Sequence, residues 1–365
     1  MQIYILVIRV LINFIHIAIM SLRRIQNAEV EGKRVLVRVD FNVELKNEDV
    51  REKYKIKAPK ETIEYLLEKN AKIALISHLG RPEGKSTPEF SLNQIRDDVE
   101  EILGIKVNFV DDCIGEKVKN ELKGLGDGEI LLLENVRFYD GEEVNDPDFS
   151  KKLTENFDIF VNEAFAVCHR DQASVTGVVK NLPSFAGFWL QKEMENLEKV
   201  KNNPEHPAVA IIGGAKIETK LPLINVFEKN YDYILVGGKI ANEAIDQEIN
   251  FGDKVILPVD FADERLDVGM ETIKKFKDVI KNAKTIVWNG PMGKFEDEKY
   301  ANGTKEILKA AIESKAYVLM GGGESVQLLE ESGMLDEISF VSTGGGAMLE
   351  YLSGSAMPGI EALKK

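Results

Sequence analysis

Lys216 and Lys220 are two lysines, four positions apart, that could together bind phosphate groups. They follow the apolar run Val209–Ile212 and the pair Gly213 and Gly214, where the pattern predicts that a strand ends and an amphipathic helix begins. Residues four apart share one face of an α-helix, so we expect both ammonium groups on one side. Glycine lets a ligand approach the backbone, and amides at a helix N-terminus attract anions. The stretch therefore predicts a phosphate site, with a plain connecting turn as the alternative.

Basic and polar side chains follow four predicted strands in the first half of the chain. These strands are Val35–Asp40, Lys72–Ser77, Ile130–Leu133 and Ile159–Asn162. The residues at their ends are Asp40, Phe41, Asn42, His78, Leu79, Gly80, Arg81, Arg137 and Arg170. An arginine guanidinium matches carboxylate and phosphate oxygens with two parallel hydrogen bonds, although a single arginine more often forms a surface salt bridge. Several such residues at neighbouring strand ends predict an anion-binding site.

Glycines end four apolar runs in the second half of the chain. These glycines are Gly213–Gly214, Gly237–Gly238, Gly321–Gly323 and Gly344–Gly346. A further predicted strand, Thr285–Trp288, leads into the polar stretch Asn289–Glu296, which includes Pro291. Backbone without side chains, placed before helix starts, favours phosphate groups, although each glycine group alone is equally compatible with a tight turn. The second half therefore predicts a site for a phosphorylated ligand.

Strands that alternate with helical patterns predict an α/β fold with two doubly wound, parallel-sheet (Rossmann-like) domains. A length of 365 residues fits two domains. A helix predicted over Phe188–Asn202 would join them as a hinge, or would be an ordinary core helix. The expected organisation is an N-terminal extension over 1–20, a first domain over 21–187, a joining helix over 188–204, a second domain over 205–345 and a C-terminal segment over 346–365 that returns to the first domain.

Composition disfavours several classes of function. The formal net charge is −14, from 47 Lys and Arg against 61 Asp and Glu, which argues against nucleic acid as the main partner. The two cysteines form no CxxC pair, which indicates a reducing compartment, and the four histidines show no zinc-ligand spacing. No GxxxxGK[ST] motif and no dinucleotide glycine fingerprint occur. We therefore expect neither a P-loop nor an NAD enzyme.

Residues 1–20 are apolar and long enough to span a bilayer, but Arg9, Asn13 and His16 interrupt them and no small-residue cleavage site follows. We expect translation to start at Met20, and we expect no membrane association. A membrane anchor is the alternative interpretation.

Nine short motifs occur in a characteristic order along the chain: RVDFNV, SHLGRP, LLENVRF, NEAF, HRDQAS, IIGGAKIETK, WNGPMGKFE, MGGGES and VSTGGGAMLEYL. In this order they resemble the phosphoglycerate kinase family, and the resemblance extends from about Met20 to the C-terminus. It implies two doubly wound domains joined by a helix, with Gly359–Lys365 returning to the first. It also implies reversible phosphoryl transfer from 1,3-bisphosphoglycerate to Mg-ADP, giving 3-phosphoglycerate and Mg-ATP, by a cytoplasmic monomer.

The resemblance also implies roles for individual residues. The catalytic residues would be Lys55, Lys216 and Lys220. The substrate-binding residues would be Asp40, Phe41, Asn42, Lys55, His78, Leu79, Gly80, Arg81, Arg137 and Arg170. The nucleotide would be held by Gly214, Lys216, Lys220, Gly237, Gly238, Asn289, Pro291, Glu296, Gly322, Gly323, Glu324 and Ser325, with Mg²⁺ on Glu324.

The chain departs from the family's pattern at three places. Lys55 aligns with the family's catalytic arginine, and a lysine keeps the charge but loses the two-pronged fork. Glu324 and Ser325 stand where the family has Asp and Thr. The segments after Ala241 and after Val259 are short, and in the family they line the adenine side. These departures leave open a non-catalytic homologue that binds nucleotide or phosphoglycerate, and a related phosphotransferase that uses another carboxylated phosphate ester.

Overall fold

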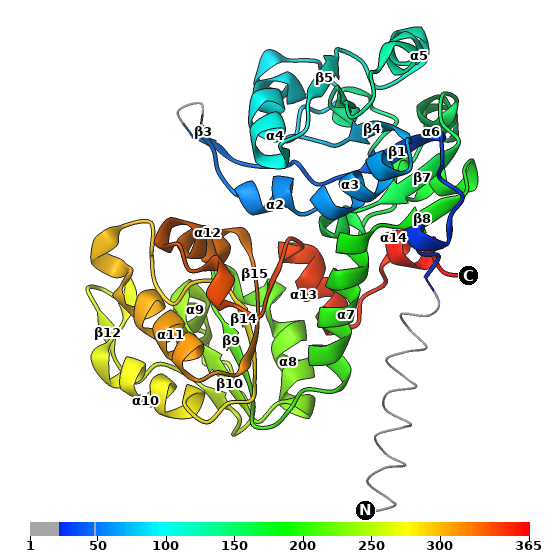
Figure 1. Cartoon of the computed structure of the whole chain (residues 1–365). Coiled ribbons are helices and arrows are strands. Elements are labelled where there is room, and N and C mark those ends of the chain that lie inside the picture. Colours follow the sequence, from blue (N-terminus) through cyan, green and yellow to red (C-terminus); the bar gives the residue numbers. More distant parts are fainter. Residues whose placement is uncertain (1–21, 47–48) are drawn as a thin grey trace, which may run out of the picture. The chain divides into compact units, whose positions relative to one another are not determined.

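A computed structural model describes residues 22–46 and 49–365 of the chain (Figure 1). The predicted extension over 1–20 lies outside the described residues. Among the described helices, none combines the length and the apolar character that crossing a membrane requires. The chain forms two compact units. The first contains the described residues up to Glu195 together with Ala356–Lys365, and the second is Asn196–Ser355.

The first unit is built on a six-stranded parallel sheet in the order β5-β6-β4-β1-β7-β8. The strands are β1 (Arg34–Arg38), β4 (Lys72–Ile76), β5 (Val107–Val110), β6 (Ile130–Leu133), β7 (Ile159–Asn162) and β8 (Ser184–Ala186). In register, Val37 pairs with Leu75 on one side and Val161 on the other. The carboxyl ends of β1, β4 and β7 therefore meet at one edge, where open α/β sheets bind ligands.

Hydrophobic cores lie on both faces of this sheet. Val35 and Val37 of β1 belong to one buried cluster, whereas Leu36 between them belongs to another. Burial on both faces explains why the strands are continuous apolar runs instead of alternating ones. The main helices of the unit are α2 (Lys53–Lys57), α3 (Lys60–Glu68), α4 (Arg96–Leu103), α5 (Gly115–Gly124), α6 (Pro147–Thr154), α7 (Phe188–Asn202), which continues into the second unit, and α14 (Pro358–Glu361). A short hairpin, β2 (Leu45–Lys46) with β3 (Asp49–Val50), precedes α2.

The second unit repeats this plan with a parallel sheet in the order β11-β10-β9-β14-β15-β16. Its strands are β9 (Ala208–Ile212), β10 (Tyr233–Val236), β11 (Val255–Ile256), β14 (Thr285–Asn289), β15 (Tyr317–Gly321) and β16 (Phe340–Ser342). Its helices are α8 (Leu221–Asn230), α9 (Gly238–Asp246), α10 (Met270–Ile280), α11 (Asn302–Glu313), α12 (Gly323–Ser332) and α13 (Gly345–Ser353). A short hairpin, β12 (Phe261–Ala262) with β13 (Asp267–Val268), precedes α10.

The predicted fold class, two doubly wound parallel-sheet domains, is confirmed. The helix predicted over Phe188–Asn202 has these limits, and the division between the units falls within it. The helix α13 belongs to the second unit, and the chain rejoins the first at Ala356. The domain limits and the hinge role of α7 stay predictions.

One local expectation is wrong. Lys216 and Lys220 do not share the face of an α-helix, because Lys216 has extended backbone (φ −133°, ψ 112°) and a 3₁₀ turn, Ile217–Thr219, separates the two lysines. The α-helix begins only at Leu221, with Pro222 in its first turn. Proline has no amide hydrogen to donate and is favoured at such a start, so it fixes where α8 begins.

Candidate functional site

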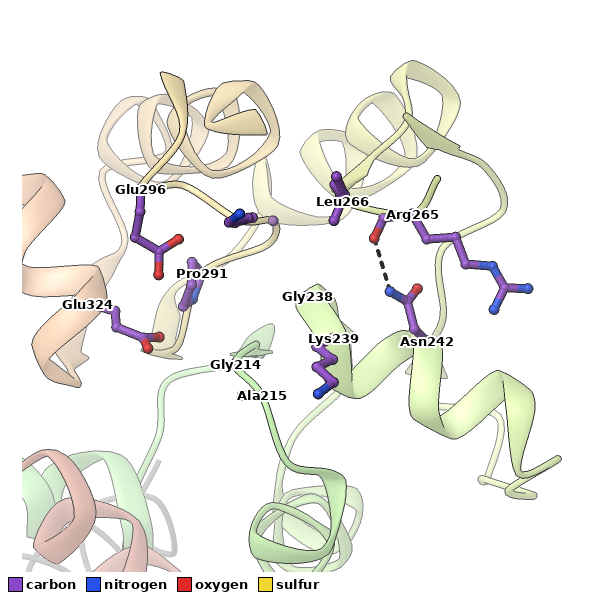
Figure 2. Close-up of a pocket in the computed structure, with 12 residues that line it drawn as sticks. Gly214, Ala215, Gly238, Lys239, Asn242, Arg265, Leu266, Pro291, Glu296 and Glu324 are labelled. Carbon is purple, nitrogen blue, oxygen red and sulfur yellow. Dashed lines mark hydrogen bonds between the residues drawn. The ribbon is translucent and has the colours of Figure 1, made fainter. Parts of the chain in front are cut away.

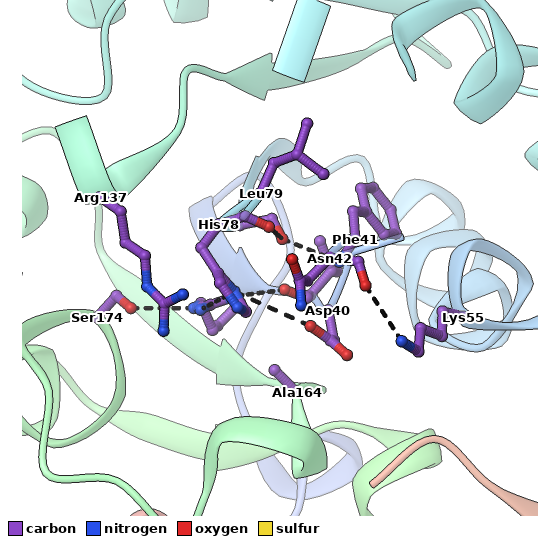
Figure 3. Close-up of polar contacts among 12 residues, drawn as sticks. Asp40, Phe41, Asn42, Lys55, His78, Leu79, Arg137, Ala164 and Ser174 are labelled. Atoms are coloured by element: carbon purple, nitrogen blue, oxygen red, sulfur yellow. Dashed lines mark hydrogen bonds and ion pairs between the residues drawn. The ribbon is translucent and has the colours of Figure 1, made fainter. Parts of the chain in front are cut away.

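The carboxyl edge of the first unit's sheet gathers polar side chains from several strand ends (Figure 3). Asn42, which follows β1, accepts a hydrogen bond on Oδ1 from the backbone amide of Gly80, which follows β4, at 2.8 Å. The amide of Phe41 donates to Ser77 Oγ at 2.9 Å. These two bonds hold the loops after β1 and β4 together. Asp40 belongs to the loop after β1, and its Oδ1 is 3.9 Å from His78 Nδ1.

Arg38, the last residue of β1, is a component of this cluster that the sequence analysis did not identify. It is completely buried, its Nε donates to Ser174 Oγ at 3.0 Å, and its Nη2 is 3.2 Å from His78 Nδ1. Ser174 in turn donates to Glu142 Oε1 at 2.5 Å. An arginine inside an apolar strand was the available signal, because a buried charge requires partners. Its contact with Ser174, which lies in the π-helical turn Ala173–Gly177, carried no signal in the sequence.

Arg137 and Arg170 bring further positive charge to the same edge. Arg137 is buried, with 4% of its surface exposed, and its Nη1 donates to the carbonyl of Gly80 at 2.7 Å. Within the described chain its Nη2 is buried with no hydrogen-bond partner. Burial, and then the charge of Arg170, lower the pKa of Arg137 to about 10, so the guanidinium stays charged at neutral pH. A buried cation with an unused donor is suited to an incoming anion.

His78 is held neutral by its surroundings. Burial is the larger cause, and the nearby Arg38, Arg137, Arg170 and Lys55 add to it, so that the pKa of His78 lies well below its usual value. A neutral imidazole offers one donor and one acceptor. His78 can therefore orient a ligand hydroxyl or carboxylate, whereas the positive charge of the site comes from the arginines and Lys55.

The remaining predicted residues on this edge differ in exposure. The side chains of Phe41 and Leu79 lie in the hydrophobic core, so only their backbone faces the site. Arg81 is exposed on the loop after β4. Lys55 in α2 donates from Nζ to the carbonyl of Asn42 at 3.1 Å, and Figure 3 shows it on the opposite side of the His78–Asp40 pair from Arg137.

Two adjoining pockets lie at the carboxyl edge of the second unit's sheet and share Gly214, Ala215 and Glu324. The first has a volume of about 240 Å³ and is shown in Figure 2. It is lined by Gly214, Ala215, Gly238, Lys239, Asn242, Arg265, Leu266, Pro291, Gly293, Lys294, Glu296 and Glu324. The second, of about 460 Å³, is lined by Gly213–Lys216, Thr219, Lys220, Asn289, Gly290, Gly322–Ser325, Gly345, Gly346 and Leu349.

Glycine is required where the segments that follow the neighbouring parallel strands β9 and β14 pack closely against each other. A Cβ atom on Gly213 would lie 2.0 Å from the backbone carbonyl oxygen of Pro291. Gly290 has φ +88°, and a Cβ there would lie 2.4 Å from the backbone of Gly213. No side chain fits at either position. Gly237, by contrast, packs beside Met292 and lines neither pocket.

Lys220 is the half-buried cation of the larger pocket. Its Nζ donates to Oδ1 of Asn289, and Asn289 Nδ2 donates to the carbonyl of Gly321 at 2.8 Å. Burial lowers the pKa of Lys220 to about 8, with Glu324 opposing the shift. The ammonium therefore remains mostly charged near neutral pH, in an environment that a phosphate would improve. Lys216 is exposed on the rim of the same pocket.

Glu324 and Glu296 are the acidic residues of these pockets. The pKa of Glu324 is raised by burial and then by the negative charge of Glu296. No cluster of three or more His, Cys, Asp or Glu side chains with metal-binding geometry occurs in residues 22–46 and 49–365. Magnesium is usually held by one or two carboxylates together with phosphate oxygens and water, so this pair fits Mg²⁺ that arrives with a nucleotide. Ser325 Oγ is buried there with no hydrogen-bond partner among the described residues.

Comparison with known proteins gives one consistent family. The model of the family described as phosphoglycerate kinase matches residues 25–264 and 250–355. The chain is 39% identical to a phosphoglycerate kinase from Borreliella burgdorferi over 392 residues, covering 94% of this chain and 100% of that protein. It is 40% identical to one from Finegoldia magna, covering 94% and 99%. The crystal structure of a Pyrococcus horikoshii phosphoglycerate kinase matches with a TM-score of 0.85 and 30% identity, covering 93% of this chain and 98% of that one.

Proposed function

Because the chain belongs to the phosphoglycerate kinase family and is an enzyme of that activity, we propose which of its residues hold each substrate and which act on the phosphoryl group. The reaction is reversible phosphoryl transfer from 1,3-bisphosphoglycerate to ADP, which gives 3-phosphoglycerate and ATP. In this proposal the carboxyl edge of the first unit binds the glycerate ligand. The two adjoining pockets of the second unit bind the nucleotide.

The observation that carries the glycerate assignment is a cluster of three arginines, of which Arg38 and Arg137 are buried. Arg38, Arg137 and Arg170 stand within electrostatic reach of one another around His78, and Arg137 has an unused buried donor. Phosphoglycerate carries a carboxylate and a phosphate, which guanidinium groups bind with charge-assisted hydrogen bonds. Asp40 and Asn42 supply acceptors for the glycerate hydroxyl. Arg81 and Lys55 complete the predicted set.

The nucleotide assignment is supported by the composition of the two pockets. The smaller pocket has glycine backbone, Pro291 and Leu266 among its walls, which suits the flat face of a base. The larger pocket combines glycine backbone with Lys216 and Lys220, which suits phosphates. Glu324, shared by both, would hold Mg²⁺ together with the phosphates, and this ion would neutralise charge on the transferring phosphoryl oxygens.

The chemistry needs no general base. A carboxylate oxygen and a nucleotide phosphate oxygen are both nucleophilic at neutral pH, so catalysis consists of in-line positioning and charge neutralisation. The exposed ammonium of Lys216 is free to follow the phosphoryl group, whereas Lys220 is tied to Asn289 and stays with the nucleotide phosphates. Lys55 contributes positive charge from the first unit.

A coupled assay tests this function directly. ADP formation from Mg-ATP is measured with 3-phosphoglycerate, and with other carboxylated phosphate esters as a substrate panel. We expect turnover with 3-phosphoglycerate to exceed that with every other ester. Binding without turnover would instead indicate a non-catalytic homologue, and a different preferred ester would indicate a related phosphotransferase.

Three finer properties belong to the same proposal. We infer that the enzyme acts as a cytoplasmic monomer, as the family resemblance implies.

The short hairpin β12–β13 brings Leu266 to the wall of the smaller pocket, and the carbonyl of Arg265 accepts a hydrogen bond from Asn242 Nδ2 at 3.0 Å. Because this hairpin is short, it encloses the base of the nucleotide less completely, and we infer that the enzyme's preference for adenine over other bases is relaxed. Turnover with Mg-GTP compared with Mg-ATP measures that preference.

A further inference from the structure

Lys55 is held by two contacts, one of which comes from a residue outside every motif that carried the family resemblance. Its Nζ lies 2.9 Å from Oε1 of Glu52 and donates to the carbonyl of Asn42 at 3.1 Å. Asn42 is itself fixed by the amide of Gly80, which donates to its Oδ1. The ammonium group is therefore tied, through Asn42, to the sheet edge that carries Asp40 and His78.

The Glu52–Lys55 pair is mostly buried. The two side chains are 14% and 12% exposed, whereas Lys60 and Glu64 on the neighbouring helix α3 are 36% and 53% exposed with 3.9 Å between their charges. Exposed ion pairs on helices contribute little because water and salt screen them. A shielded pair at 2.9 Å restricts the lysine more strongly. Glu52 also has a left-handed backbone conformation, φ 57°, which residues other than glycine rarely adopt. Its carboxylate lies beside Lys55, three positions further along the chain.

The ammonium group of Lys55 has one N–H that its two contacts do not use. A lysine ammonium has three N–H groups, and the two contacts use two of them, which leaves one for the oxygen of a ligand. A guanidinium would place several donors by its own planar shape, but an ammonium on a flexible stem has no such preset geometry. The carboxylate and the carbonyl supply that geometry from outside.

From these contacts we propose that Glu52 is a positioning residue for phosphoryl transfer, which fixes the Lys55 ammonium so that its remaining donor meets a transferring phosphoryl oxygen. The inference rests on the proposed function, in which Lys55 acts on that group. Glu52 also partly cancels the charge of Lys55, so its contribution is to place the donor and not to attract substrate. It therefore acts on kcat more than on substrate affinity.

The test is a double-mutant cycle with Glu52→Gln, Lys55→Met and the double variant. Glu52→Gln is expected to lower kcat about tenfold or more, since small misplacements of a catalytic group are costly, while Kd for 3-phosphoglycerate changes less than about twofold. In the Lys55→Met background, Glu52→Gln is expected to change kcat no further. Glu64→Gln, which removes the exposed carboxylate on α3, is the matched control and is expected to keep the wild-type kcat. Thermal unfolding of each variant verifies that it is folded.

Two results would overturn the inference while leaving the proposed role of Lys55 intact. One is an unchanged kcat in Glu52→Gln, and the other is an equal loss of kcat with and without Lys55, which would mean that Glu52 supports helix α2 instead. A wild-type kcat in Lys55→Met would instead refute the catalytic role of Lys55 itself. The cycle therefore separates failure of the inference from failure of the function on which it rests.

Discussion

We expect Glu163 to make the stability of the first unit depend on pH in a direction unusual for a carboxyl group. This completely buried carboxylate follows β7 and accepts hydrogen bonds from the amides of Trp189 at 3.2 Å and Leu190 at 2.8 Å, and from the hydroxyl of Thr62. Thr62 Oγ1 accepts from the amide of Phe188 at 2.8 Å. Amides in the first turn of a helix have no partner within the helix. Glu163 and Thr62 thus anchor the start of α7.

The size of the expected change in the free energy of unfolding follows from the pKa of Glu163. Burial raises the pKa of Glu163 from 4.5 to about 7, although its three hydrogen bonds oppose the shift. Because the folded state holds this proton more tightly than the unfolded state does, the stability gained from it is present below about pH 4.5 and is lost as pH rises through 7. At about 1.4 kcal/mol for each pKa unit, the full loss is about 3.5 kcal/mol, of which about 2.5 kcal/mol falls between pH 5 and pH 8.

The perturbation is Glu163→Gln, which keeps an oxygen acceptor for the amides of α7 and removes the titration. Urea unfolding is followed by hydrogen exchange with mass spectrometry, since peptides from the two units can then be separated. Relative to wild type, the variant's first unit is expected to gain about 2.5 kcal/mol on moving from about pH 5 to about pH 8. Glu155→Gln, on an exposed residue of the same unit, is expected to show no such trend. A pH-independent difference between Glu163→Gln and wild type would refute the reasoning.

Three further predictions concern the site and its framework. Lys216→Ala is expected to lower kcat about 100-fold or more with little change in substrate Kd, because the charge of Lys216 acts on the phosphoryl group during transfer. Rapid-quench kinetics measures kcat and calorimetry measures Kd. An unchanged kcat would remove Lys216 from the mechanism. Gly213→Ala is expected to destabilise the second unit by about 2 kcal/mol or more, since the new methyl would overlap the carbonyl of Pro291; an unshifted unfolding midpoint would contradict this. Burial raises the pKa of the Cys113 thiol well above its usual value and raises the pKa of Cys168 to about 12. Native protein at pH 8 is therefore expected to resist alkylation by iodoacetamide. Rapid alkylation without denaturant would contradict this prediction.

Sequence periodicity predicted the strands of the first sheet well where every residue of the strand is buried. The limits of β6 and β7 match the predicted Ile130–Leu133 and Ile159–Asn162. The edge strands β5 and β8 were not predicted, because β5 has two half-buried residues and β8 is only three residues long. Short or partly exposed strands give a weak pattern.

The residues missed at the site share one physical cause. The side chain of Arg38 is held by Ser174, which is distant in sequence. The carboxylate of Glu52 is placed beside Lys55 by a left-handed backbone. Neither arrangement can be recognised from the local spacing of residue types. Lys216 and Lys220 were placed on a common helix face because their spacing of four fits an α-helix, but Pro222 and the 3₁₀ turn before it set another geometry. Sequence motifs predicted which strand ends carry chemistry. Tertiary contacts decide how each side chain is held there.

The division of the two substrates between the two units is the central claim, and crossed calorimetry measures it most directly. Kd for 3-phosphoglycerate and for Mg-ADP is determined with wild type, Arg137→Met and Lys220→Met. We expect Arg137→Met to weaken 3-phosphoglycerate binding by about tenfold or more and to leave Mg-ADP within about twofold, because a buried charged hydrogen-bond partner is lost at one site only. Lys220→Met should show the reverse. If either variant weakens both ligands equally, the proposed assignment of the two sites is contradicted.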